Sequence, residues 1–174
     1  MKRGIFRRLW KARYALLVGV LVAGVVFGAS TVGVGKSLYV CSDINSTLTP
    51  IQAYDIQGTT LTFQQQVNLN IGYNAVGLAI DTDSKVLFLT REGYSTIHII
   101  DAETLTPVGV VTATGSDNLA GIVVDQDKER VYAVDRTETV LYVYDWDTST
   151  QALTPVTGSP FTLANISGGY SGGN

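Results

Sequence analysis

The chain has 174 residues and a formal net charge of −3, and 45% of its residues are hydrophobic. This length suits one ordinary domain, and this composition excludes a disordered polar chain, a collagen and a disulfide-stabilised scaffold. One cysteine and one histidine exclude an internal disulfide and a Cys/His zinc site.

The first 35 residues predict an export signal or a membrane anchor. Six of the twelve basic residues lie before Tyr14, and the first acidic residue is Asp43. An uncharged stretch runs from Tyr14 to Gly35, and Ala15–Gly28 is its most apolar part. A basic segment followed by an apolar run and small residues is typical of a secretory signal peptide, here with cleavage after Ser30. The alternative is an uncleaved hydrophobic helix, because about 20 apolar residues span a bilayer.

Residues 36–174 contain a sequence repeat with a period of 44 residues. Val76–Thr104 aligns without a gap on Ala120–Thr148. The identical pairs are Gly77 and Gly121, Asp81 and Asp125, Asp83 and Asp127, Asp101 and Asp145, and Thr104 and Thr148. A looser first copy contains Ser37–Cys41 and Ile51–Asp55. We therefore divide this region into repeats at approximately 36–75, 76–119 and 120–174.

Each full copy predicts four short strands, because its segments are rich in β-branched and aromatic residues and are separated by turn residues. In the second copy the strands are Val76–Ile80, Val86–Thr90, Thr96–Asp101 and Pro107–Thr112. In the third copy they are Ala120–Val124, Arg130–Val134, Val140–Asp145 and Ala152–Thr157. No segment after residue 35 has a helical period, so we expect an all-β region.

Several of these strands are apolar on both faces, as in Ile97–Ile100 and Leu141–Tyr144. Such strands are typical of a sheet that is covered on both sides. Four-stranded antiparallel units of about 44 residues with two buried faces match the blades of a β-propeller. We expect about three such blades after an N-terminal hydrophobic helix, with a β-sandwich as the alternative.

Two segments of the chain resemble the propeller repeats of the YVTN and NHL type. They read GLAID followed by VLFLTREGYSTIHIID, and GIVVD followed by RVYAVDRTETVLYVYD. The resemblance covers Leu38 to Thr157 and implies a propeller architecture, but it does not specify a ligand. Closed propellers have at least about four blades. Three repeats therefore predict an open arc, to be completed by more chain, by other copies or by another arrangement of sheets.

Propellers bind ligands at the mouth of the central channel, on the loops that enter the innermost strands. The corresponding segments here are Asn70–Ala75, Gly115–Ala120 and Ser167–Asn174. The candidate binding residues in them are Tyr73, Asn74, Asp117 and Asn118. Their side chains offer hydrogen bonds, or oxygen ligands for Ca²⁺. The alternative interpretation is that the Gly, Asn and Asp residues only form tight turns.

No catalytic residue and no metal site is assigned from the sequence. The acidic pairs Asp81/Asp83 and Asp125/Asp127 recur in successive repeats, so we interpret them as residues that close hairpin turns. His98 lies within a predicted strand and is interpreted as a packed or edge histidine. It is the only candidate base, so no Ser/His/Asp set can be formed.

These features predict an exported or surface-tethered repeat module with a non-catalytic binding or structural role. Its partner would be a protein, a peptide or a cell-envelope polymer, and no cofactor is expected other than Ca²⁺. Nucleic acid is excluded because the chain after residue 13 has a net charge of −9. Membrane contact is expected only through the N-terminal segment. The alternatives are a metal-dependent propeller enzyme of the lactonase or lyase type, and a structural protein that forms homo-oligomers through exposed blade edges.

Overall fold

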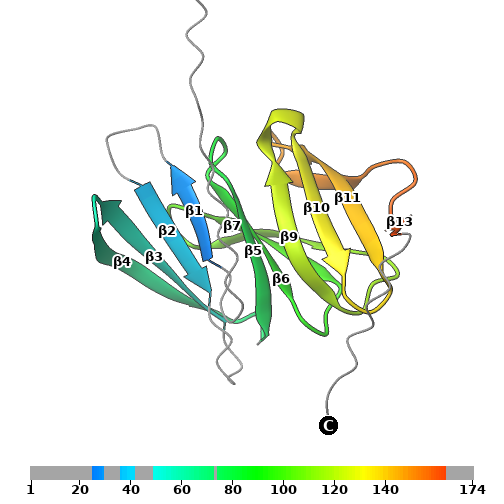
Figure 1. Cartoon of the computed structure of the whole chain (residues 1–174), viewed down its shortest axis with the longest axis horizontal. Helices are drawn as coiled ribbons and strands as arrows, with labels where there is room; N and C mark the ends of the chain where they lie inside the picture. Colours follow the sequence, from blue (N-terminus) through cyan, green and yellow to red (C-terminus); the bar gives the residue numbers. More distant parts are fainter. Residues whose placement is uncertain (1–24, 30–35, 42–48, 73, 164–174) are drawn as a thin grey trace, which may run out of the picture.

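The computed structural model describes residues 25–29, 36–41, 49–72 and 74–163, which form three antiparallel sheets (Figure 1). Sheet A contains β1 (Val25–Ala29), β2 (Lys36–Cys41), β3 (Thr49–Gln57) and β4 (Thr60–Leu69). Sheet B contains β5 (Ala75–Asp81), β6 (Val86–Arg91), β7 (Thr96–Asp101) and β8 (Pro107–Thr112). Sheet C contains β9 (Leu119–Asp125), β10 (Arg130–Asp135), β11 (Val140–Asp147) and β12 (Ala152–Pro155), and the short β13 (Phe161–Thr162) also pairs with β11.

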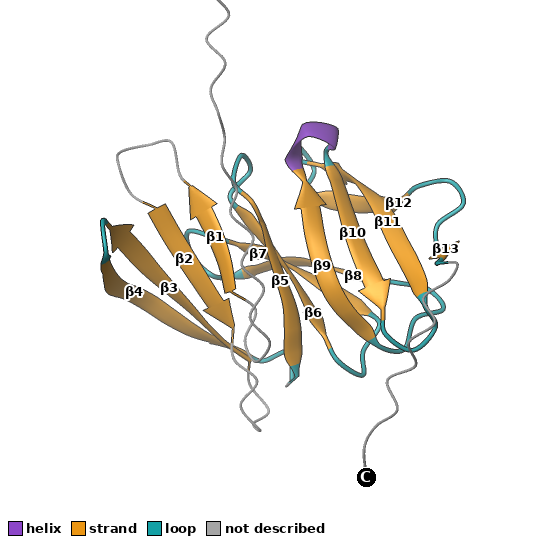
Figure 2. Ribbon diagram, viewed as in Figure 1, coloured by secondary structure: helices purple, strands orange, loops and turns teal. Residues whose placement is uncertain are grey.

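The three sheets follow one another as an open arc with sheet B in the middle (Figures 1 and 2). In each sheet the first four strands lie side by side in sequence order. The first strands β1, β5 and β9 are neighbours along the arc, and β4, β8 and β12 are the outer edges. This all-β arrangement is of the β-propeller type, as predicted. A β-sandwich is excluded, because two different sheets cover the two faces of sheet B.

Two separate apolar cores lie on either side of sheet B. The core between sheets A and B is built from Tyr39, Cys41, Ile51, Ala53, Leu69, Ala75, Leu78, Leu87, Leu89, Ile100, Ala102 and Leu105. The core between sheets B and C is built from Val86, Phe88, Ile97, Ile99, Ala113, Leu119, Val131, Ala133, Tyr142, Tyr144, Trp146 and Leu153. Because sheet B lies between these cores, every residue of β6 is buried. This burial is the physical reason for strands that are apolar on both faces.

The strands predicted for the second and third repeats are confirmed, and their ends differ from the prediction by no more than two residues. The first repeat was predicted less completely. The two segments predicted for it, Ser37–Cys41 and Ile51–Asp55, lie within β2 and β3, but the outer strand β4 was not predicted. Most side chains of β4 are exposed, so its sequence lacks the apolar pattern by which a strand is recognised.

Val25–Ala29 differ from the prediction of a hydrophobic helix. They form β1, which pairs antiparallel with β2 from Val25 opposite Val40 to Ala29 opposite Lys36. Periodicity alone cannot distinguish a helix from a buried strand in a continuous apolar run, and the pair Val25–Val26 favours a strand. The rest of the predicted helix lies outside the described residues. In the described part of the chain, no helix is long and apolar enough to cross a membrane.

Aspartates at the ends of strands close the hairpin turns, as the repeat predicted. The Asp81 carboxylate accepts a hydrogen bond from the main-chain N–H of Asp83, and Asp125 accepts one from Lys128. Asp125 thereby caps a single 3-10 turn between β9 and β10, the one helical element among the described residues (Figure 2). Short Asp side chains favour such turns because they reach main-chain N–H groups two or three residues ahead.

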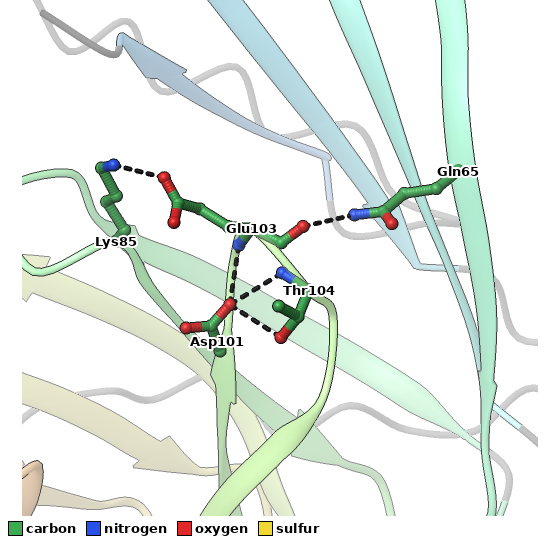
Figure 3. A network of polar contacts seen from close by, with 5 residues as sticks. All are labelled: Gln65, Lys85, Asp101, Glu103 and Thr104. Carbon is green, nitrogen blue, oxygen red and sulfur yellow. Dashed lines mark hydrogen bonds and ion pairs between the residues drawn. The ribbon is translucent and has the colours of Figure 1, made fainter. Parts of the chain in front are cut away.

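The turn after β7 also connects sheet B to sheet A (Figure 3). The Asp101 carboxylate accepts hydrogen bonds from the main-chain N–H groups of Glu103 and Thr104 and from the Thr104 hydroxyl. The Glu103 side chain pairs with Lys85, and its main-chain carbonyl accepts a hydrogen bond of 2.7 Å from Gln65 of β4. Polar contacts thus join the two sheets beside their shared apolar core.

Candidate functional site

The loops that enter β5 and β9 lie at one end of sheets B and C, together with two hairpin turns. Ala75 at the start of β5 is opposite Arg91 at the end of β6, and Leu119 is opposite Asp135 in the same way. We call residues 70–74, 92–95, 113–118 and 136–139 the mouth loops. Tyr73 and the predicted loop Ser167–Asn174 lie outside the described residues, so the described mouth contains Asn74, Asp117 and Asn118.

Asn118 joins the mouth loops of the two sheets. Its side-chain oxygen Oδ1 accepts a hydrogen bond of 2.9 Å from the main-chain N–H of Gly93, and its carbonyl accepts one of 3.0 Å from Arg136. The main-chain N–H of Leu119 donates to the carbonyl of Tyr94 at 3.0 Å. Each of these contacts fixes one loop against another, so Asn118 has a structural role in this surface.

Asp135, at the end of β10, also holds these loops together. It was not among the site residues predicted from the sequence. Its side chain is buried, and Oδ2 accepts hydrogen bonds from the Ser116 hydroxyl at 2.5 Å and from the Asn118 N–H at 3.2 Å. Burial raises the pKa of Asp135, but hydrogen bonds from Ser116, Glu138, Thr137 and Asn118 outweigh burial and leave the pKa below 3.8. The sequence feature that could have identified Asp135 is its position at the end of a predicted strand, because aspartates at strand ends close turns elsewhere in this chain.

Asn74 lies beside the turn that Asn118 contacts. Its φ is 65°, in the left-handed region that asparagine tolerates better than most residues, and its carbonyl accepts a hydrogen bond of 2.8 Å from Glu92. Asn74 and Asn118 therefore flank the Glu92–Gly93 turn, and the structure brings these two predicted residues together. Both use main-chain or side-chain oxygen atoms to hold that turn.

Asp117 is the predicted residue that the structure leaves exposed. Near it in the mouth loops, Glu92 of one sheet and Arg136 of the next form an ion pair in which both side chains remain about 40% exposed. The Arg91 guanidinium lies 3.6 Å from the centroid of the Tyr94 ring, a cation–π contact. The mouth thus presents charged groups of both signs on loops that are fixed to one another.

His98 is a packed residue of a central strand, which confirms one of the two predicted environments. It lies in β7 between β6 and β8 and is half-buried. Burial, together with the positive charge of Arg91, lowers the pKa of His98 to about 4. Within the described ranges, no three His, Cys, Asp or Glu side chains gather closely enough to hold a metal ion.

The opposite end of sheets B and C contains a buried polar contact that the sequence did not reveal. Asp81 of β5 accepts hydrogen bonds of 2.9 Å from the Trp146 indole N–H and from the Gln126 side chain. The Trp146 ring packs edge-on against Phe88, with 4.8 Å between the ring centroids. Asp81 therefore stabilises the junction of two sheets and is not available to a ligand.

Several solved structures of other proteins resemble this fold, although no protein-family model and no curated protein sequence matches the chain. A candidate 6-phosphogluconolactonase of Bacteroides fragilis has a TM-score of 0.61 and 19% identity, over 80% of this chain and 38% of that chain. A chain of the nidogen/laminin complex has a TM-score of 0.56 and 19% identity, over 77% and 47%. The Dos1 propeller has a TM-score of 0.56 and 13% identity, over 82% and 34%.

These likenesses define the class of the fold, which is that of a β-propeller. Identities of 13–19% show shared architecture only, and propellers serve many unrelated functions. This chain spans less than half the length of each of the three matched chains.

Proposed function

We propose that this chain is an exported or surface-tethered module of YVTN/NHL-type repeats that binds a ligand without catalysing a reaction. The ligand is a protein, a peptide or a cell-envelope polymer. The observation that supports this proposal is the set of mouth loops, which Asn118 and Asp135 hold together as one polar surface. A surface that is ordered before binding loses little conformational entropy when it binds.

The chemistry of the mouth favours a peptide-like ligand. The exposed Asp117 carboxylate and the half-exposed Glu92–Arg136 pair offer charge-assisted hydrogen bonds to amide and charged groups. The net negative charge of the region after residue 13 disfavours a polyanion. We therefore place the binding site on the mouth loops, with Asp117 as a contact residue.

The substitution Asp117→Asn tests this site. Peptides selected from a phage-displayed random library on the wild-type protein are expected to bind the variant about tenfold more weakly, because one charge-assisted hydrogen bond is lost. Binding is measured by fluorescence anisotropy, and thermal unfolding confirms that the variant is folded.

The matched control is Asp127→Asn, at an exposed aspartate of the same sheet at its opposite end. This control is expected to leave peptide binding unchanged. Equal affinities of the wild type and Asp117→Asn, or an equal loss in Asp127→Asn, would show that the mouth loops are not the binding site.

A metal-dependent enzyme of the lactonase or lyase type is the second candidate, because one similar structure is described as a candidate 6-phosphogluconolactonase. Such a site needs oxygen ligands from several loops, and Asn74, Asp117 and Asn118 are the residues that the sequence predicts for it. Calcium titration followed by thermal unfolding tests the enzyme candidate. A saturable rise in melting temperature that Asp117→Asn abolishes would establish the metal site that the enzyme requires, and no rise would count against a Ca²⁺-dependent enzyme.

The proposal of export has a consequence for β1. Cleavage after Ser30 would remove Val25–Ala29, and β2 would then have unpaired main-chain groups along its inner edge. We therefore expect the exported chain to retain Val25–Ala29. N-terminal sequencing of the protein from the host envelope or medium checks this expectation, and a first residue after Ser30 would contradict it.

The stability of two truncated chains measures what β1 contributes. A chain without residues 1–30 is expected to melt at least about 5 °C below a chain without residues 1–24, because only the second keeps the β1–β2 pairing. Equal melting temperatures would show that sheet A does not need its inner strand.

A further inference from the structure

Val25–Ala29 belong both to the predicted membrane anchor and to sheet A. The uncharged stretch Tyr14–Gly35 is bounded by Arg13 and Lys36, so a membrane span in this part of the chain has to lie between these two charges. In the structure, the middle of this stretch is β1, which pairs with β2 along its whole length. The same five residues therefore have two different uses.

The length of the uncharged stretch makes the two uses exclude each other. A helix needs at least about 17 apolar residues to cross the hydrocarbon of a bilayer, which is about 30 Å thick. Every segment of that length within Tyr14–Gly35 contains Val25–Ala29. When β1 is paired, the uncharged residues before it are Tyr14–Gly24, and as a helix they reach only about 16 Å. A chain with β1 in sheet A thus has no span in this stretch.

Main-chain hydrogen bonding leads to the same exclusion. In hydrocarbon, a single segment satisfies its main-chain N–H and C=O groups only as a helix, because no water is present to bond to them. In β1 these groups belong to a ladder with β2. β2 pairs on its other side with β3, and β1 lies beside β5 of sheet B. Val25–Ala29 therefore have to leave the sheet before they can enter a bilayer.

The sequence of Val25–Ala29 is compatible with both structures. Val25 and Val26 are β-branched, and such residues favour a strand in water. The same residues continue the apolar run that begins at Ala15, and valine and phenylalanine favour insertion of a helix into lipid. A segment with two favourable states responds to a change of surroundings, because the surroundings decide which state has the lower free energy.

We propose that Val25–Ala29 are a two-state segment, which forms β1 when the chain is outside the membrane and part of a membrane-spanning helix when the chain is tethered. This inference rests on the surface tethering proposed above. In the tethered chain, the inner edge of β2 loses the strand that pairs with it. Release from the membrane returns that strand, so detachment completes sheet A.

A disulfide across β1 and β2 measures whether the two strands are paired. Gly28 is opposite Ser37, and opposite residues of adjacent strands lie within the distance that a disulfide bridges. The full-length chain with Gly28→Cys, Ser37→Cys and Cys41→Ala is reconstituted into vesicles of phosphatidylcholine and phosphatidylglycerol and mildly oxidised. Alkaline extraction of the same vesicles measures separately whether the chain spans the bilayer. We expect the chain to resist extraction and to form little of this disulfide.

The added substitution Gly24→Arg shifts the segment to its other state. Gly24 lies at the middle of the uncharged stretch and outside β1, so an arginine there opposes a span but leaves the strand intact. This variant is expected to be extracted from the vesicles and to form at least about tenfold more of the disulfide. The matched control is Ala12→Arg, which adds the same charge outside the stretch and is expected to behave as the chain without it.

A second cysteine pair confirms that sheet A is otherwise folded. Ser37 is also opposite Asp55 of β3, so Ser37→Cys with Asp55→Cys should form a disulfide in every chain. Extraction of the chain without an added arginine would overturn the tethering and this inference with it. If that chain resists extraction but forms as much of the β1–β2 disulfide as the Gly24→Arg variant, the tethering stands and the two-state segment is wrong. A folded Gly24→Arg variant without this disulfide would also overturn the inference.

Discussion

Replacing Asp81 with alanine is expected to lower the free energy of unfolding by about 3 kcal/mol, because buried donors lose a charged acceptor. Asp81 is only 3% exposed. Its carboxylate accepts hydrogen bonds from Trp146 and Gln126 of sheet C and from the Ser84 hydroxyl of its own turn. The alanine variant would leave the Trp146 indole N–H buried without this acceptor and would remove a direct link between two sheets.

The same carboxylate is expected to make stability depend on pH under acidic conditions. Burial raises the pKa of Asp81, but hydrogen bonds from Ser84, Gln126 and Trp146 outweigh burial and hold the pKa below 3.8. A carboxylate whose pKa is lower in the folded than in the unfolded state stabilises the fold above the unfolded pKa. This contribution is lost as the pH falls from the unfolded pKa through the folded pKa. Over this pH range, the free energy of unfolding should fall less in the alanine variant than in the wild type.

Urea unfolding followed by tryptophan fluorescence measures both effects. The matched control is Asp125→Ala, at the equivalent position of the next repeat, where the described hydrogen bonds of the carboxylate come from Lys128 and the Asp127 main chain, both in its own turn. A smaller loss is expected there, because no second sheet depends on that side chain. Equal losses in the two variants would contradict the role of Asp81 as a link between sheets.

Replacing Gly77 with alanine is expected to destabilise the fold by about 3 kcal/mol through overpacking. A Cβ atom at Gly77 would collide with the Thr90 hydroxyl and with the main-chain carbonyl of Ala120 in β9. These two groups are themselves joined by a hydrogen bond of 2.6 Å. The inner strands of sheets B and C approach so closely that no side chain fits between them.

The equivalent glycine of the third repeat is the control. A Cβ atom at Gly121 would meet only Val134, at an ordinary contact distance of 3.4 Å. Thermal unfolding at low protein concentration should therefore show a large fall in melting temperature for Gly77→Ala and a small change for Gly121→Ala. A similar fall in both variants would mean that the glycines serve strand geometry rather than the close approach of two sheets.

The strands of sheets B and C could be predicted from the sequence because the two repeats confirm one another. Most apolar positions of the strands in one copy have an apolar counterpart 44 residues later, as in Leu87 and Val131 or Ile97 and Leu141, so the two copies support the same strand assignment. Sheet A has no such close copy. Its edge strand β4 is mostly exposed, and its inner strand β1 belongs to an apolar run that local pattern assigns equally well to a helix.

The candidate site was predicted in part. The mouth loops were expected from the repeat order, and the structure places Asn74 and Asn118 on either side of the Glu92–Gly93 turn. Their chemical roles were not predictable, because an asparagine that binds a ligand and one that holds a loop look the same in sequence. Asp135 was missed for the same reason, since its partners Ser116 and Asn118 lie 17 or more residues away.

The sequence by itself determined the repeat, the strands of its second and third copies and the all-β class, since these depend on local pattern and on comparison within the chain. Only the tertiary structure decided which copy of a repeated residue is buried. Asp81 and Asp125 occupy the same position in successive repeats, yet Asp81 contacts Trp146 of the next sheet and Asp125 contacts its own turn. The difference arises because burial depends on a neighbouring sheet, and sheet C has no following sheet among the described residues.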